Sequence, residues 1–175
     1  MARFTRNPPL AAAAATAVLA LGGAGLTGWN WYAAAHDDAL AFARGRDDVA
    51  AAGAQAVQNL NTLDHRELTA GYDTWEDSTT GELHEQLTDG RGQFTERVRE
   101  ARTVTTARVL STAVTELDDR AGRAAVMVAL RITVTAPEQE PAVKESRMLG
   151  ELTRTPQGWK LSGLSQASLG ESAGQ

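Results

Sequence analysis

The chain opens with a long stretch of apolar and small residues. No charged residue lies between Leu10 and Ala35, and Arg3 and Arg6 stand before that stretch. A membrane-spanning helix needs about 20 mostly apolar residues, whereas the hydrophobic region of a cleaved signal runs to about 7–15. The pattern therefore predicts a cytoplasmic tail over residues 1–9 and a transmembrane helix over residues 10–35.

Aromatic residues gather at the end of this stretch, at Trp29, Trp31 and Tyr32. Amphipathic aromatic rings favour the level of the lipid headgroups, so these three residues are the predicted membrane-interface positions. A cleaved signal is the alternative, because the small residues of "AAAHDD" offer a site for a peptidase. We favour a retained single-pass anchor in the cell membrane, with the short tail inside and the C-terminal domain extracytoplasmic.

The next part of the chain has helical periodicity. Residues 36–61 place Val49, Ala56 and Leu60 on one face. Asp64 followed by Glu67 has the spacing of a capping box and predicts the start of a second short helix. The glycines of "TDGRG" predict a break before a third helical segment, whose apolar face contains Phe94, Val98 and Ala101.

After Arg102 the period changes from helical to two, which is typical of strands. Four strands are predicted, separated by the turn "DDRAGR", the longer loop "APEQEPAVKE" and the turn "TPQG". Their apolar faces carry Val126 to Val134 at alternate positions, Met148 with Leu152, and Trp159 with Leu161. The strands are expected at residues 103–117, 123–135, 146–154 and 159–164, followed by a disordered tail over residues 165–175.

Three helical pieces followed by about four antiparallel strands indicate an α+β class. One face of the sheet would cover the helices, and the domain would span residues 36–164. Its predicted core joins the apolar strand faces to Leu60, Leu68, Tyr72, Trp75 and Phe94.

Charge and cysteine content restrict the function. The 175-residue chain has a formal net charge of −5, whereas a nucleic-acid-binding protein needs a basic face, so nucleic acid is not an expected partner. The absence of cysteine excludes disulfides, thiolate zinc sites and thiol catalysis.

Several phrases together resemble the Mce-associated membrane proteins of actinobacteria. They are "AAGAQAVQNLNTLDHREL", "STTGEL", "DDRAGRAAVMVALRITVT" and "GWKLSGL". This chain differs from typical members at His65 and Leu83, where they carry an aromatic residue. The resemblance implies a cone-shaped domain similar to the nuclear-transport-factor-two-like fold, with about three helices on a curved sheet. It also implies an accessory role in Mce lipid-import machines and no catalytic residues.

Few residues offer chemistry of their own. Five residues are candidates for acid–base catalysis in a pocket: Asp64, His65, Glu76, Asp77 and His84. The predicted helix cap already explains Asp64 and His65. His84 has no second histidine four residues on, so no metal site is expected, and no cofactor either. The arginines from Arg91 to Arg102 favour a salt-bridged helix surface over a strip that contacts anionic lipid.

Tyr72, Trp75 and Trp159 are the candidate pocket or partner contacts, although aromatics at helical spacing more often belong to a core. The favoured function is a non-enzymatic accessory protein of an Mce-type lipid or sterol import system. Its partners would be membrane lipid, through the N-terminal helix, and Mce transporter proteins, with an apolar ligand as a further candidate. The alternatives are an envelope scaffold of a secretion or conjugation apparatus, and a pocket isomerase or dehydratase.

Overall fold

The structure is a computed structural model, and it describes the backbone of residues 8–167 and the side chains of residues 23–33 and 39–167. The chain divides into two compact units, with the boundary between Arg44 and Gly45. That boundary falls inside the first helix, α1, which runs from Pro8 to Leu60. The second unit therefore begins later than residue 36, where the sequence placed the start of the domain.

The first unit consists of the N-terminal part of α1. Among its described side chains, several large apolar ones are exposed: Leu26, Trp29, Trp31 and Phe42. Within the described residues, no helix has a stretch long and apolar enough to span a membrane. The predicted tail and the first half of the predicted span lie outside the residues whose side chains are described.

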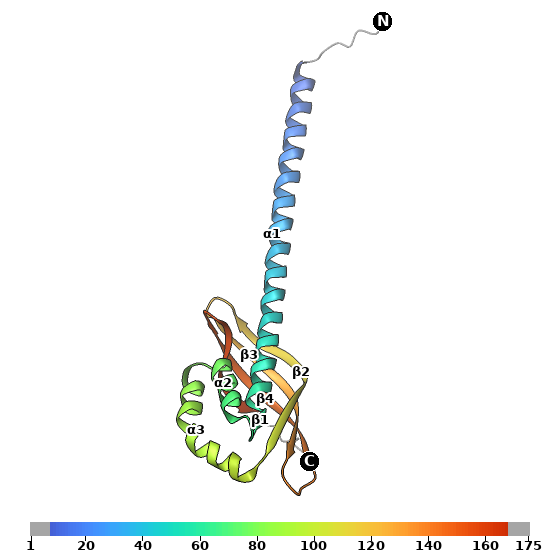
Figure 1. Ribbon diagram of the computed structural model, residues 1–175. Coiled ribbons are helices and arrows are strands. Elements are labelled where there is room, and N and C mark those ends of the chain that lie inside the picture. The colour runs from blue at the N-terminus through green and yellow to red at the C-terminus, as the bar shows by residue number, and fades with distance from the viewer. Residues whose placement is uncertain (1–7, 168–175) are drawn as a thin grey trace, which may run out of the picture. The chain divides into compact units, whose positions relative to one another are not determined.

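The second unit adds two helices and five strands to the end of α1 (Figure 1). In chain order they are β1 (Leu63–Asp64), α2 (Leu68–Ser78), α3 (Gly81–Ala101), β2 (Val104–Asp118), β3 (Arg123–Thr135), β4 (Ala142–Thr155) and β5 (Gly158–Gln166). The strands form one antiparallel sheet in the order β1-β2-β3-β4-β5. This is the α+β class that the sequence predicts, with the short strand β1 added.

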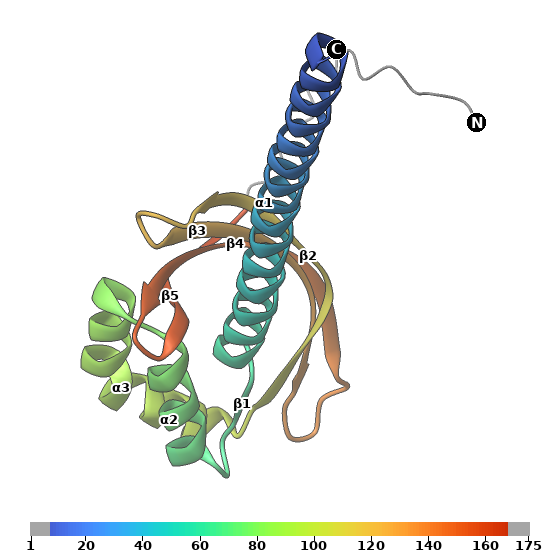
Figure 2. The ribbon, with the colours of Figure 1, turned by 90° about the horizontal axis from the view of Figure 1, so that it is seen from above.

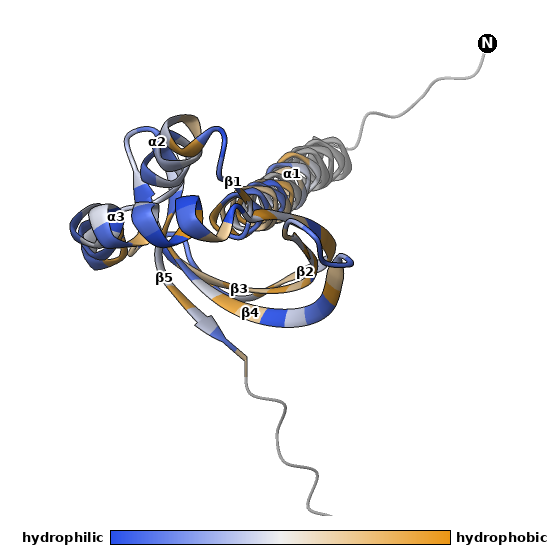
Figure 3. Ribbon diagram, turned by 60° about the horizontal axis from the view of Figure 1, so that its bottom comes forward, coloured by the Kyte–Doolittle hydropathy of each residue, from blue (hydrophilic) through white to orange (hydrophobic). Residues whose placement is uncertain are grey.

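Alternation along the strands separates a buried face from an exposed one. In β3, Val126, Val128 and Leu130 are fully buried, whereas Met127 among them and Arg131 after them are exposed. Figure 3 shows both hydrophobic and hydrophilic residues along the strands of the sheet. The register between β2 and β3 shifts between Val109 and Ser111 and again between Val114 and Glu116, so the imperfect alternation of β2 reflects bulges.

The last turns of α1 lie in the curve of the sheet (Figure 2). Val49 and Val57 are fully buried there, in one cluster with the inward residues of the strands. Two glycines permit this close approach. A Cβ atom on Gly53 would lie 2.7 Å from a methyl of Val126, and one on Gly150 would lie 2.9 Å from a methyl of Leu161.

Side chains from the end of α1 also cover one edge of the sheet. The backbone N–H of Ala107 donates to the Thr62 hydroxyl at 3.2 Å, and that of Val109 donates to the Gln58 side-chain oxygen at 3.2 Å. An uncovered strand edge presents unpaired amides that can pair with another chain. Here side chains at and just after the end of α1 accept hydrogen bonds from two backbone amides on the edge of β2.

Helix α3 corrects the break predicted at "TDGRG". The helix is continuous from Gly81 to Ala101, and a Cβ atom at Gly90 or Gly92 would meet no atom within 4 Å. Glycine weakens a helix by about 1 kcal/mol per residue, which tertiary contacts on either side can outweigh. The contacts of Arg91 and Phe94 with α2, described below, hold the helix across this point.

The capping box predicted at Asp64 and Glu67 is also wrong. Glu67 is the N-cap residue of α2, and no side chain caps that helix end. Asp64 instead belongs to β1, and its carboxylate accepts a hydrogen bond from the backbone N–H of Arg66 at 2.9 Å. An aspartate that bonds to the amide two residues on stabilises a turn, and it competes with the helical cap.

Two boundaries of the last strands differ from the prediction. β4 begins at Ala142, inside the segment expected to be a loop, because residues 142–147 pair with β3. β5 continues to Gln166, so Ser165 and Gln166, expected in the disordered tail, form the end of a strand. The remainder of that predicted tail from residue 168 lies outside the described residues.

A pair of glycine substitutions tests the packing of α1 on the sheet. Gly53→Ala should destabilise the domain by about 1 kcal/mol, because a clash costing about 1–3 kcal/mol exceeds the helical preference for alanine. Gly90→Ala should stabilise it by about 0.5–1 kcal/mol, because that position is open and helical. Denaturant unfolding of the full chain measures both changes, and equal effects at the two positions would contradict the packing described.

Candidate functional site: an apolar groove at the end of α1

Trp75 joins α2 to the C-terminal end of α1. Its indole N–H donates to the carbonyl oxygen of Asn59 at 2.8 Å, and its ring is almost completely buried. The last carbonyls of a helix have no partner within the helix, so this bond satisfies one of them. The ring also contacts Tyr72 edge-on, with centroids 5.3 Å apart, and Phe94 at 5.7 Å.

Tyr72 fixes α3 beside α2. Its hydroxyl oxygen accepts a hydrogen bond from Thr95 at 3.0 Å, and the guanidinium of Arg91 lies over its ring at 4.8 Å. Arg91 also forms an ion pair with Glu76 at 2.9 Å. A buried satellite cluster of Leu63, Leu68, Tyr72, Trp75 and Val98 results, separate from the main core.

A groove of about 390 Å³ opens where this aromatic cluster meets the sheet. We call it the α1-end groove. Its lining is mostly apolar and comes from every neighbouring element: Leu60 of α1, Asn61 after it, Leu63 of β1, Trp75 of α2, Phe94, Arg97, Val98 and Ala101 of α3, Thr103 before β2, and Thr105, Ile132, Val134 and Lys144 of the sheet. Small-molecule sites typically have volumes of roughly 300–1,000 Å³ and mainly apolar walls, which this groove matches.

The only charged residues that line this groove are two cations, Arg97 and Lys144. Lys144 lies opposite Ile132 in the register of β3 and β4, and Ile132 lies opposite Ala107 in β2. Residues that pair across strands share a face, so this row of the concave face changes from two buried apolar residues to a lysine. Within the described part of the chain, neither Arg97 nor Lys144 forms an ion pair.

The structure separates the three aromatic residues that the sequence singled out as pocket or partner contacts. Tyr72 and Trp75 lie in the satellite cluster, and Trp75 lines the α1-end groove. Trp159 packs instead against the main core, and the guanidinium of Arg154 lies 4.6 Å from its ring centroid. The proposed interface residues Trp29, Trp31 and Tyr32 belong to the first unit, where they are exposed on α1.

The acid–base candidates do not converge. Asp64 and His65 share a turn, with 3.5 Å between the Nδ1 atom of His65 and a carboxylate oxygen of Asp64. Glu76 is paired with Arg91 on the helical hairpin. His84 belongs to α3, and its Nδ1 atom is 3.3 Å from the Thr79 hydroxyl, while Asp77 belongs to α2.

Arg66 determines the charge state of Asp64. The guanidinium donates to both carboxylate oxygens, and the backbone N–H of Arg66 adds a third donor. These hydrogen bonds, those of the side chain first, lower the pKa of Asp64 from 3.8 to about 2. A carboxylate held in this way is a poor general base. Among the described residues, no three acidic, histidine or cysteine groups are placed to hold a metal ion.

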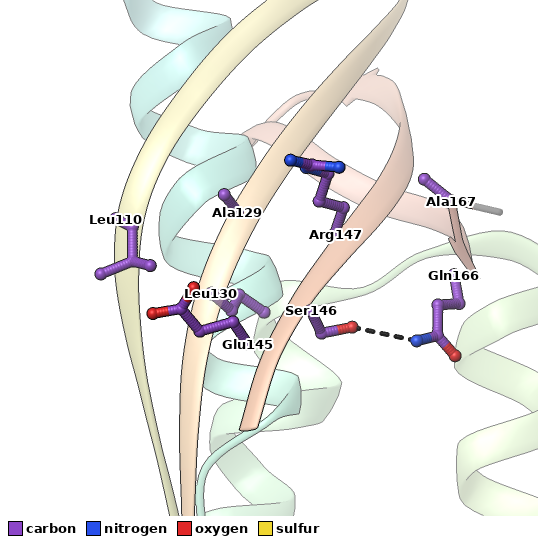
Figure 4. A pocket seen from close by; sticks show the side chains of 8 residues that line it. All are labelled: Leu110, Ala129, Leu130, Glu145, Ser146, Arg147, Gln166 and Ala167. Atoms are coloured by element: carbon purple, nitrogen blue, oxygen red, sulfur yellow. Dashed lines mark hydrogen bonds between the residues drawn. The ribbon is translucent and has the colours of Figure 1, made fainter. Parts of the chain in front are cut away.

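A second hollow, of about 270 Å³, lies where β5 leaves β4 (Figure 4). Most of its polar side chains are already bonded. The Gln166 amide donates to the Ser146 hydroxyl at 3.3 Å, and Glu145 pairs with Arg131 at 2.8 Å, whereas Arg147 has no ion pair among the described residues. The α1-end groove is the better candidate site, because its walls are more apolar.

Sequence reasoning did not assign Lys144 to a site, although a signal was present. Met148 and Leu152 were placed on one face of the third predicted strand, and stepping back by twos from Met148 reaches Ser146 and Lys144. The two prolines before this segment favoured a loop and hid the alternation. Arg97 was interpreted as part of a salt-bridged surface, but only Arg99 and Glu96 of α3 pair in that way.

A curved antiparallel sheet that holds the end of a long helix and carries a helical hairpin is the α+β fold of nuclear-transport-factor-two-like and VirB8-like domains. The chain belongs to the family described as uncharacterized protein Rv1363c/MT1408-like, whose model matches residues 8–162. No curated protein matches the sequence. The family description names no activity, so the role expected from the Mce resemblance stays a prediction.

Solved structures with this fold include two proteins of type IV secretion systems and one periplasmic domain. An IcmL-like type IV secretion system protein from Legionella pneumophila is 12% identical, with a TM-score of 0.58 over 74% of this chain and 97% of that one. The periplasmic domain of DotI is 16% identical, with a TM-score of 0.56 over 68% of this chain and 92% of that one. CagV, a VirB8 homolog of the type IV secretion system of Helicobacter pylori strain 26695, is 15% identical, with a TM-score of 0.54 over 70% of this chain and 98% of that one. Identities this low show a shared fold.

The bond between Asp64 and Arg66 predicts a pH dependence. Because folding lowers the pKa of Asp64 to about 2, its stabilising contribution is present above about pH 4 and is lost as the pH falls through about 2. Wild type should therefore melt above Asp64→Asn at pH 6, and the gap should close by pH 2. Melting temperatures of the full chain measure this, with Asp73→Asn as the control for loss of an exposed carboxylate. A gap of equal size at pH 6 and pH 2 would exclude this role.

Proposed function

We propose that this protein is a non-enzymatic assembly module of a membrane-bound apparatus in the cell envelope, and that its second unit works outside the cytoplasm. The observation that carries the proposal is the fold it shares with the IcmL-like type IV secretion system protein and with CagV. DotI supplies a periplasmic domain with this fold. A secretion or conjugation apparatus is accordingly the first candidate for the assembly.

The proposal assigns partner contact to the outer face of the sheet. Ala113, Met127 and Leu149 lie opposite one another on β2, β3 and β4 and form one row on that face. Met127 and Leu110 are each more than a third exposed. Exposed apolar side chains that cluster on one face are typical of surfaces that bind other proteins. The occupant would be another protein subunit of the same apparatus.

The chemistry of the domain is consistent with a role through contacts. The acid–base candidates lie in separate places, and Arg66 holds the Asp64 carboxylate. General acid–base catalysis requires groups within hydrogen-bonding reach of one substrate. We therefore favour assembly over the isomerase or dehydratase alternative.

An Mce-type lipid import system is the second candidate for the apparatus. The phrases ending at "LDHREL" and "GWKLSGL" favour it, because they resemble Mce-associated proteins. In that setting the same outer face would contact transporter proteins. The two candidates differ in the identity of the partner and not in the physical role of the domain.

Photo-crosslinking in living cells tests the assembly role. A photoreactive amino acid at Met127 should produce a discrete crosslinked species with a membrane-apparatus protein, because this side chain is at the centre of the exposed row. The same amino acid at the exposed Thr69 of α2 is the matched control and should crosslink at least about fivefold less to that protein, as expected for a position outside the contact surface.

Mass spectrometry of the species crosslinked at position 127 identifies the apparatus. Secretion or conjugation components support the first candidate, and Mce transporter proteins support the second. Equal crosslinking at positions 127 and 69, or no partner at either position, would reject the outer face as an assembly surface.

Membrane topology can be measured because the chain has no cysteine of its own. In intact cells, a membrane-impermeant maleimide should label Asp73→Cys on α2, and should label Asn7→Cys only after lysis. Both labelled chains should run at full length in the membrane fraction. The opposite labelling pattern, or a shortened chain in the culture fluid, would contradict a retained anchor with an extracytoplasmic domain.

A further inference from the structure

We propose that the α1-end groove binds a single-chain amphiphile with a carboxylate head, of which a long-chain fatty acid is the simplest example. The apolar walls would take the hydrocarbon chain, while Arg97 and Lys144 would take the carboxylate. This ligand site goes beyond the proposed assembly role and lies on the concave side of the sheet, away from the row of Met127.

The walls fit a hydrocarbon chain because their apolar atoms come from packed, fixed side chains. Trp75 is held by its bond to the Asn59 carbonyl, and Ile132 is almost completely buried in the sheet. Phe94 extends toward solvent at 37% exposure, so a large aromatic surface stays uncovered beside the groove. Burial of apolar surface stabilises a bound chain by roughly 25 cal/mol per Å².

The head group follows from the charges. The groove has no acidic residue in its lining, although the whole chain carries a net charge of −5. The guanidinium of Arg97 lies 5.9 Å from the ring centroid of Phe94, which keeps it at the apolar surface. Lys144 stands on the concave face beside Ile132, where it is exposed and forms no ion pair with a described residue. Charge-assisted bonds to a carboxylate would satisfy both cations.

The size of the groove favours one chain over two. Its volume of about 390 Å³ is near the lower end of the roughly 300–1,000 Å³ of small-molecule sites. A two-chain phospholipid would need more apolar wall than these residues provide. A short acidic peptide would leave its backbone polar groups against apolar walls without partners, which is costly.

Photolabelling of the purified full chain tests the proposal directly. The protein is kept in solution by amphipathic peptides that surround its apolar N-terminal helix, without added lipid. The probe is palmitic acid that carries a diazirine in its acyl chain. We expect adducts on peptides of α3 and of β3 or β4 that line the groove. The alcohol with the same acyl chain and diazirine should label those peptides about tenfold less, because it lacks the charge.

Variants on strand β4 distinguish binding at a specific site from non-specific binding of the probe. Lys144→Glu should reduce labelling by the acid about tenfold, whereas Lys144→Arg should retain it. Arg147→Glu is the matched control, because it makes the same reversal on the opposite face of β4 and should leave labelling unchanged. Arg97→Glu should act like Lys144→Glu, with Arg99→Glu as its control. Melting temperatures verify that each variant is folded.

Equal labelling by the acid and the alcohol would overturn the proposal, as would labelling that Lys144→Glu and Arg147→Glu reduce to the same extent. Adducts confined to peptides before Arg44 would show that the probe recognises only the apolar part of α1. The labelling uses the isolated protein, so its outcome does not depend on whether the outer face of the sheet has a partner.

Discussion

The close packing of the last turns of α1 into the curve of the sheet is the constraint on which the rest of this domain depends. Gly53 on the helix lacks the side-chain atom that would clash with Val126, and Gly150 on β4 leaves room for the side chain of Leu161 between strands and helix. Val49 and Val57 consequently reach full burial beside Val126. An antiparallel sheet of this size has no other large element on its concave side at that point, so its apolar face is buried chiefly by this helix.

The same packing determines where a ligand could enter. Because the last turns of α1 lie in the curve of the sheet, the α1-end groove opens where the helix ends at Leu60. The end of a helix carries unpaired carbonyls, and the indole of Trp75 satisfies that of Asn59. The aromatic cluster therefore closes the helix end and forms one wall of the groove.

Alternation and helical spacing made the main core predictable, because a residue such as Leu130 can be buried only if its strand is paired in one register. The failures have local physical causes. The glycines at Gly90 and Gly92 were interpreted as a break, but tertiary contacts of Arg91 and Phe94 decide the helix there. The carboxylate of Asp64 could bond to either a helix end or the Arg66 amide, and sequence spacing does not distinguish between them. The position of Lys144 in the groove depends on pairing with β3, which the two preceding prolines obscured.

Strand β4 connects the two proposed activities without making them compete. Leu149 points to the outer face beside Met127, whereas Lys144, an odd number of residues away, points to the concave face beside Ile132. Successive side chains of a strand point to opposite faces, so a partner on one face and an amphiphile on the other do not displace each other sterically. Any coupling between them would have to pass through the β4 backbone or its pairing with β3. The N-terminal part of β4, up to Arg147, carries Lys144 and pairs with β3 alone. Strand β5 pairs only with the part of β4 that follows. That end is therefore the part of the sheet where a bound head group could most readily alter strand geometry.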